Sequence, residues 1–98
     1  VKAALEASVR YLAHEHGKKS IRVNAISAGA VATRAASGLQ HFDELLNETR
    51  RSAPLRRTVE ASEVGRTALI LASDYMSAVT GETIYVDAGF HIQGMVFH

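Results

Sequence analysis

Few side chains in this sequence are of the types that carry chemistry, and their spacing excludes several kinds of site. The chain has no cysteine, which excludes disulfides and thiolate metal sites. His14 and His16 lie two residues apart in a helical pattern and point to different faces, so we expect no bound metal. Lys2 heads the first helical pattern, and its ammonium offers three hydrogen-bond donors and a positive field, although by residue type alone it is interpreted as a solvated helix lysine.

A second candidate is the loop of small residues at positions 28–38, which follows a predicted strand. Doubly wound α/β folds bind their ligands in loops just past the carboxyl ends of strands. Asn24, inside the predicted strand, is interpreted as a hydrogen-bonded structural amide. The seven glycines include no GxGxxG motif, so the glycine-rich turn that holds a pyrophosphate is absent from these residues.

The bulk composition is that of an ordinary globular protein. Of the 98 residues, 47% are hydrophobic and 21% charged, and the net charge is +1, which favours neither a nucleic-acid partner nor an acidic surface. No apolar run approaches the roughly 20 residues that span a bilayer, so no membrane association is expected. The sequence opens with Val inside a helical pattern, which predicts a fragment of a longer protein. A reducing cytoplasm fits the lack of cysteine.

The pattern predicts alternating helices and strands in the order of half a doubly wound sheet. A helix is expected over residues 1–16, a strand over 21–26, a helix over 40–51, a helix from Ser62 to about 73, and a strand over 83–87. The fold class is therefore α/β, part of a Rossmann-like parallel sheet. Two strands do not form a stable parallel sheet alone, so further strands must come from elsewhere.

Capping residues and apolar spacing define these elements more closely. The first helix should bury an apolar face and end at Gly17, and the third should begin at Ser62 as N-cap with Glu63 in its first turn. Pro54 should end the middle helix. The expected apolar face of the first helix comprises Val1, Leu5, Val9 and Leu12.

Three stretches resemble a known family. Residues 1–13 resemble the helix that follows the catalytic tyrosine in short-chain dehydrogenase/reductases. The second stretch is IRVNAISAG at residues 21–29, followed by Thr33 and by AASG at residues 35–38, and the third comprises residues 53–65, 80–82 and 86–91. The first stretch is common to the superfamily, whereas the run from NAISAG to AASG and the ending VDAGFHIQGM at residues 86–95 resemble type I enoyl-acyl-carrier-protein reductase. The resemblance covers nearly all of the sequence but only about the last third of a family member, which implies a C-terminal portion of one Rossmann-like domain.

The resemblance implies a cofactor role for two places. Lys2 would bind the nicotinamide ribose of NAD and support a catalytic tyrosine that lies upstream of these residues. The loop after the first strand would contact the same cofactor, with backbone near Val31 holding the carboxamide and the Thr33 hydroxyl donating to the pyrophosphate. The implied cofactor-binding residues are Lys2, Val31, Ala32, Thr33, Arg34 and Ala35.

The resemblance also implies a substrate loop and helix over residues 30–52. Small residues near the nicotinamide and apolar residues on the helix would form a wall for the acyl chain. Its implied members are Ala35, Ala36, Leu39, Phe42 and Leu45.

The implied reaction is NADH-dependent reduction of trans-2-enoyl-acyl-carrier-protein in fatty acid elongation, by a homotetramer. The 98 residues alone are expected to be inactive, because they lack the tyrosine. Two alternatives stay open: another short-chain dehydrogenase/reductase such as 3-oxoacyl-acyl-carrier-protein reductase, or a non-catalytic α/β fragment.

Overall fold

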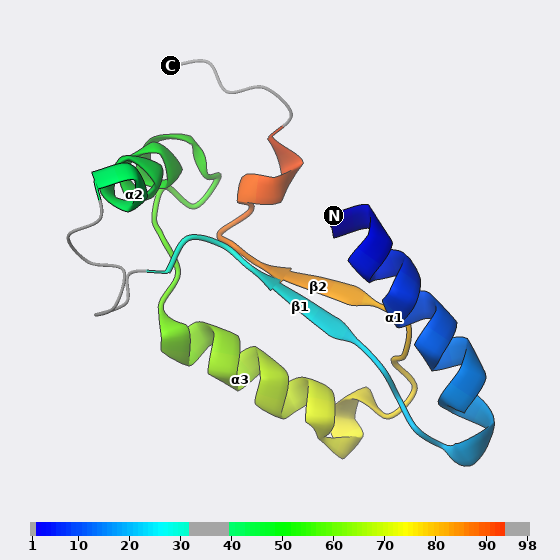
Figure 1. The fold of residues 1–98 in the computed structure, drawn as a ribbon. Coiled ribbons are helices and arrows are strands. Elements are labelled where there is room, and N and C mark those ends of the chain that lie inside the picture. The colour runs from blue at the N-terminus through cyan, green and yellow to red at the C-terminus, as the bar shows by residue number, and fades with distance from the viewer. Residues whose placement is uncertain (1, 32–39, 94–98) are drawn as a thin grey trace.

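The computed structural model describes residues 2–31 and 40–93, and of Lys2 and Gln40 it describes the backbone alone. Two parallel strands form a small sheet, with α1 against one face and α3 against the other, while α2 lies beyond the carboxyl ends of the strands (Figure 1). The elements are α1 Lys2–His16, η1 Gly17–Lys19, β1 Ala25–Ala28, α2 Gln40–Ser52, α3 Ala61–Ala72, η2 Asp74–Met76, β2 Thr83–Val86 and η3 Phe90–Ile92. The predicted α/β class with parallel strands is confirmed.

The sheet pairs β1 and β2 in parallel, with Ala25 opposite Thr83 and Ala28 opposite Val86. β1 begins later than the pattern predicted, because the backbone before it pairs with a turn and not with a strand. Asn24 makes the junction: its side-chain N–H donates to the Val79 carbonyl at 3.0 Å, and its side-chain oxygen accepts from the Glu82 N–H at 3.1 Å. The prediction of Asn24 as a hydrogen-bonded structural amide is confirmed.

The inner face of α1 differs from the predicted apolar face. Val9 and Ala13 are buried and Glu6 is half-buried, at the spacing of one helix face, whereas Leu5 and Leu12 are exposed. The helix has two apolar sides, and periodicity alone does not say which of them meets the sheet. The end of α1 also differs, since η1 continues the chain and the left-handed conformation falls on Ser20 (φ 62°), not on Gly17.

α3 begins at Ala61, two residues after Val59, and its N-cap is Glu60 and not the predicted Ser62. Glu60 and Glu63 form a reciprocal capping box, in which each side chain accepts from the other residue's backbone N–H. The Arg57 guanidinium donates two hydrogen bonds, of 2.8 and 2.9 Å, to the two oxygens of the Glu63 carboxylate. These bonds, led by that from Arg57, lower the pKa of Glu63 from 4.5 to about 2.

The main buried cluster lies at the carboxyl ends of the strands and not at the centre of the sheet. Ala53, directly after α2, is fully buried against Val59 and Ala88, and partly buried apolar residues surround the three. Those surrounding residues are Val31, Val64, Val86 and Phe90. The cluster holds the chain at Val31, where the predicted cofactor-binding residues begin, and at Ala53, directly after α2.

Candidate functional site

The start of α1 lies beside the carboxyl ends of the strands. α1 runs antiparallel to β2: the Tyr85 hydroxyl donates to the Glu6 carboxylate at 2.8 Å, and a methyl group placed on Gly81 would lie 3.5 Å from the Ala13 Cβ. Lys2 precedes Glu6 by four residues on the same helix face, about 6 Å further along the axis. The Lys2 backbone therefore lies level with the end of β2, and its side chain lies outside what the structure describes (Figure 1).

The chain leaves β1 toward the predicted cofactor loop along a fixed path. Gly29 crosses the end of β2 so closely that a Cβ at this position would be 2.7 Å from the Asp87 Cβ. Val31 then forms an isolated parallel bridge with Val59. Of the predicted cofactor-binding loop the structure describes Val31 alone, and the role of Val31 in cofactor binding stays a prediction. Ala32, Thr33, Arg34, Ala35, Ala36 and Leu39 lie outside the described residues.

α2 places the two described members of the predicted acyl-chain wall in different surroundings. Phe42 is half-buried and Leu45 is 45% exposed, while the neighbouring Leu46 is buried. Further along the same helix, the hydroxyl of buried Thr49 donates a hydrogen bond to the Leu45 carbonyl at 2.9 Å. Phe42 therefore lies partly within the packed side of α2, and Leu45 offers open apolar surface beside it.

The turn after β2 contains a buried carboxylate that the sequence analysis did not single out. Asp87 accepts hydrogen bonds from the backbone N–H groups of Gly89 and His91, both at 2.9 Å, and its Oδ2 lies 3.0 Å from His91 Nδ1. The His91 ring stacks on Tyr85 with centroids 3.8 Å apart. The i, i+4 spacing of Asp87 and His91 was the available signal.

Neither a metal centre nor a membrane span is found within residues 2–31 and 40–93. No group of three metal-ligating side chains gathers in the described part, and the contact between His41 and Glu44 is a surface pair at 3.8 Å. Within the same part of the chain, no helix combines the length and the apolar character needed to cross a bilayer. Arg51 and Arg57 form ion pairs with Glu48 and Glu63, respectively.

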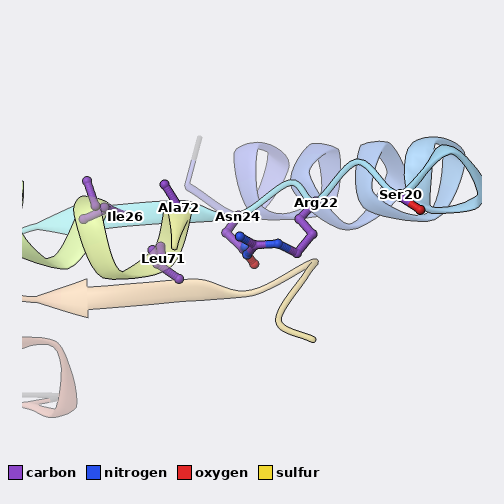
Figure 2. A pocket seen from close by; sticks show the side chains of 7 residues that line it. Ser20, Arg22, Asn24, Ile26, Leu71 and Ala72 are labelled. Atoms are coloured by element: carbon purple, nitrogen blue, oxygen red, sulfur yellow. The ribbon is translucent and has the colours of Figure 1, made fainter. Parts of the chain in front are cut away.

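A hollow of about 470 Å³ lies at the amino half of the sheet, away from the candidate site. Figure 2 shows Arg22 and Asn24 extending toward it from the segment before β1, with Leu71 and Ala72 of α3 alongside. The Arg22 guanidinium donates to the Val79 and Ser73 carbonyls at 3.2 and 3.4 Å. The guanidinium of Arg22 is thus hydrogen-bonded to the backbone. This hollow is not the predicted cofactor site.

These features define a class. A parallel sheet covered by helices on both faces, with small residues and a helix start at the carboxyl ends of its strands, is part of a Rossmann-like α/β domain. The family model described as Enoyl-(Acyl carrier protein) reductase matches residues 1–91, so the chain belongs to this family. The resemblance inferred from the sequence is confirmed.

Several characterised relatives are similar over almost the whole chain. The enoyl-acyl-carrier-protein reductase (NADH) of a Nostoc species is 55% identical over 96% of this chain and 36% of its own length. The NADPH enzyme of Staphylococcus aureus is 54% identical over 92% of this chain and 35% of its own. The chain thus spans about a third of the length of these relatives.

Two solved structures share the fold. The Bacillus cereus enoyl-acyl carrier protein reductase, crystallised with NADP+ and indole naphthyridinone, superposes with a TM-score of 0.87 at 54% identity, covering 96% of this chain and 37% of that one. The Anaplasma phagocytophilum enzyme in complex with NAD gives 0.85 at 49% identity, covering 96% and 34%. One of these two solved relatives therefore contains NADP+ and the other contains NAD.

Proposed function

We propose that residues 1–98 are the C-terminal third of an enoyl-acyl-carrier-protein reductase, and that the complete enzyme reduces trans-2-enoyl-acyl-carrier-protein during fatty acid elongation in the cytoplasm. The observation that carries the proposal is the meeting of two family elements at one sheet edge. The start of α1 and the chain at Val31 both lie at the carboxyl ends of β1 and β2, in a chain about 55% identical to named enoyl reductases.

In this proposal, residues at different positions bind the cofactor and the acyl chain. Lys2, at the head of α1, donates to the ribose hydroxyls and holds a positive charge near the catalytic phenol that the rest of the enzyme supplies. The backbone at Val31 and the loop residues Ala32, Thr33, Arg34 and Ala35 hold the nicotinamide and pyrophosphate. Ala35, Ala36, Leu39, Phe42 and Leu45 form the apolar wall along the acyl chain. When bound, the nicotinamide cofactor supplies the hydride that reduces the β-carbon.

NADH is proposed as the preferred cofactor. The Nostoc relative is named for NADH and the S. aureus relative for NADPH, so family membership supports a nicotinamide cofactor without choosing between the two. Steady-state rates of the complete enzyme with each cofactor decide the matter: a lower KM for NADH supports the choice, and a lower KM for NADPH contradicts it.

The reaction is tested by comparing the complete enzyme with the 98-residue chain. We expect the complete enzyme to oxidise NADH with a crotonyl thioester and the 98 residues alone to show no turnover, because the pyrophosphate turn and the tyrosine are supplied elsewhere. Absorbance at the NADH band measures both, and NADH fluorescence titration measures binding.

Two results would contradict the proposal. Turnover by the 98 residues alone would show that these residues hold a whole active site. Reduction of an acetoacetyl thioester in preference to the crotonyl thioester would indicate a 3-oxoacyl reductase instead.

A further inference from the structure

Four side chains from two distant segments form a connected chain beside the end of β2. The Tyr85 hydroxyl donates to a Glu6 carboxylate oxygen at 2.8 Å. The Tyr85 ring stacks on His91 at 3.8 Å with an interplanar angle of 11°. His91 Nδ1 lies 3.0 Å from the Asp87 carboxylate. These contacts link α1 to the turn after β2 across 79 residues of sequence.

The end of this chain at Asp87 is rigid. Asp87 is only 7% exposed, and its carboxylate accepts the backbone N–H groups of Gly89 and His91. The intervening turn is further fixed by the Ala88 carbonyl, which accepts the Leu55 N–H at 3.1 Å. These hydrogen bonds hold the His91 ring in place, and the Tyr85 ring stacks on it.

The other end of the chain lies one helical turn from Lys2. Glu6 shares the inner face of α1 with buried Val9 and Ala13, and Lys2 precedes it at i−4 on that face. The hydrogen bond to Glu6, with the nearby negative charge, raises the pKa of Tyr85 above its usual value of 10. The Tyr85 hydroxyl is a protonated donor at neutral pH, as a tyrosine ordinarily is, and Glu6 is its acceptor.

We propose that Tyr85 is a positioning residue, which holds Glu6 and thereby sets the first turn of α1 at the height from which Lys2 reaches the cofactor. The inference rests on the proposed role of Lys2. The first turn of a helix lacks half of its backbone hydrogen bonds, so a side-chain tie near it decides where that turn lies. Losing one such hydrogen bond should weaken cofactor binding by about three- to tenfold.

The test uses the complete reductase and the substitution Tyr85→Phe, which keeps the ring on His91 and removes the hydroxyl. We expect the KM for NADH to rise by about three- to tenfold and amide hydrogen exchange to accelerate in residues 2–9, with the melting temperature unchanged. Tyr75→Phe is the matched control, because Tyr75 is 90% exposed and its loss of a hydroxyl should change neither quantity.

Substitutions at Glu6 separate positioning from general stability. Glu6→Gln keeps an acceptor oxygen and should retain most of the affinity for NADH, whereas Glu6→Ala should match Tyr85→Phe. The double variant Glu6→Ala with Tyr85→Phe should be no worse than either single variant, because both remove the same interaction. Additive losses, or a Tyr85→Phe enzyme with unchanged KM and exchange, would overturn the inference.

Lys2→Met distinguishes failure of this inference from failure of the proposed function. If Lys2→Met weakens NADH binding and Tyr85→Phe leaves it unchanged, the positioning role of Tyr85 is wrong and the cofactor role of Lys2 stands. If Lys2→Met itself leaves NADH binding unchanged, the proposed role of Lys2 is wrong and the inference about Tyr85 fails with it.

Discussion

Gly29 directly follows β1 and passes very close to Asp87, which directly follows β2. A methyl group there would lie 2.7 Å from the Cβ and 2.9 Å from the Cα of Asp87. The obstructing atoms belong to the backbone and to its first side-chain carbon, so they cannot rotate away. The glycine is therefore needed for spacing: it lets the loop cross the end of β2 while Asp87 stays buried.

We expect Gly29→Ala to destabilise the complete reductase by about 1–3 kcal/mol, the usual cost of overpacking. Gly65→Ala is the matched control, because a Cβ at Gly65 in α3 meets no atom within 4 Å. Alanine in an exposed helix position should stabilise by up to about 1 kcal/mol. Denaturant unfolding of both variants measures the difference, and a Gly29→Ala enzyme as stable as the control would contradict the steric argument.

Two positions of the candidate site, Lys2 and Val31, were proposed from the sequence and its family resemblance, and their roles in cofactor binding remain predictions. Lys2 heads the predicted helix and Val31 follows the predicted strand, and both lie at the same sheet edge in the structure. The link between Glu6 and Tyr85 could not be predicted, because it joins positions 79 residues apart whose proximity depends on the packing of α1 against β2. Composition and local spacing carry no information about that packing.

Among the elements, α3 begins with a carboxyl group, that of Glu63, whose pKa is strongly lowered. Glu63 holds the capping box together and receives two hydrogen bonds from Arg57, and these lower its pKa from 4.5 to about 2. A carboxyl group whose pKa falls on folding stabilises the fold fully when the unfolded chain is also ionised, that is, above about pH 4.5. This contribution is lost as the pH falls from about 4.5 to about 2.

We therefore expect Glu63→Gln to lower the melting temperature at pH 7, with the gap from the parent protein narrowing between pH 5 and pH 3. Glu44→Gln is a suitable control, because the Glu44 side chain is 67% exposed and its partner atom on His41 is 3.8 Å away. Thermal melts across this pH range measure the gap. A gap that is independent of pH would show that the Glu63 charge does not stabilise α3.

Helices and strands were predicted in the correct order, and their errors lie at ends and faces. The N-cap of α3 was placed on Ser62 because serine is a preferred cap, whereas the structure uses Glu60, whose partner Glu63 completes the box. The inner face of α1 was rotated toward Leu5 and Leu12, which are exposed. Both errors concern choices between two locally acceptable options, which tertiary contacts decide.

At the scale of the whole molecule, apolar side chains remain uncovered on both outer helices. Tyr11 and Leu12 of α1 are 69% and 42% exposed, and Leu69 and Ile70 of α3 are 69% and 46% exposed. We propose that the complete enzyme is a homotetramer, in which neighbouring subunits cover part of this apolar surface and the rest of the same subunit covers the remainder.

We expect the complete reductase to have the mass of a tetramer and Leu69→Glu to reduce that mass to a smaller assembly, because the charge would be buried at an interface. Ser62→Glu places the same charge on an exposed position of α3 and should leave the mass unchanged. Light scattering after size exclusion measures both. A tetrameric Leu69→Glu enzyme would show that this part of α3 is not an interface.

The pairing of β1 with β2 also has a consequence for biosynthesis. The hydrogen bonds that close the sheet join positions 58 residues apart, so β1 leaves the ribosome well before its neighbour exists. At a synthesis rate of about 5–20 residues per second, the delay is roughly 3–12 s. During that time this edge of β1 presents unpaired backbone groups, which can capture a strand from another nascent chain. We therefore expect chaperones that bind nascent chains on polysomes to reduce the aggregation of this protein during its synthesis.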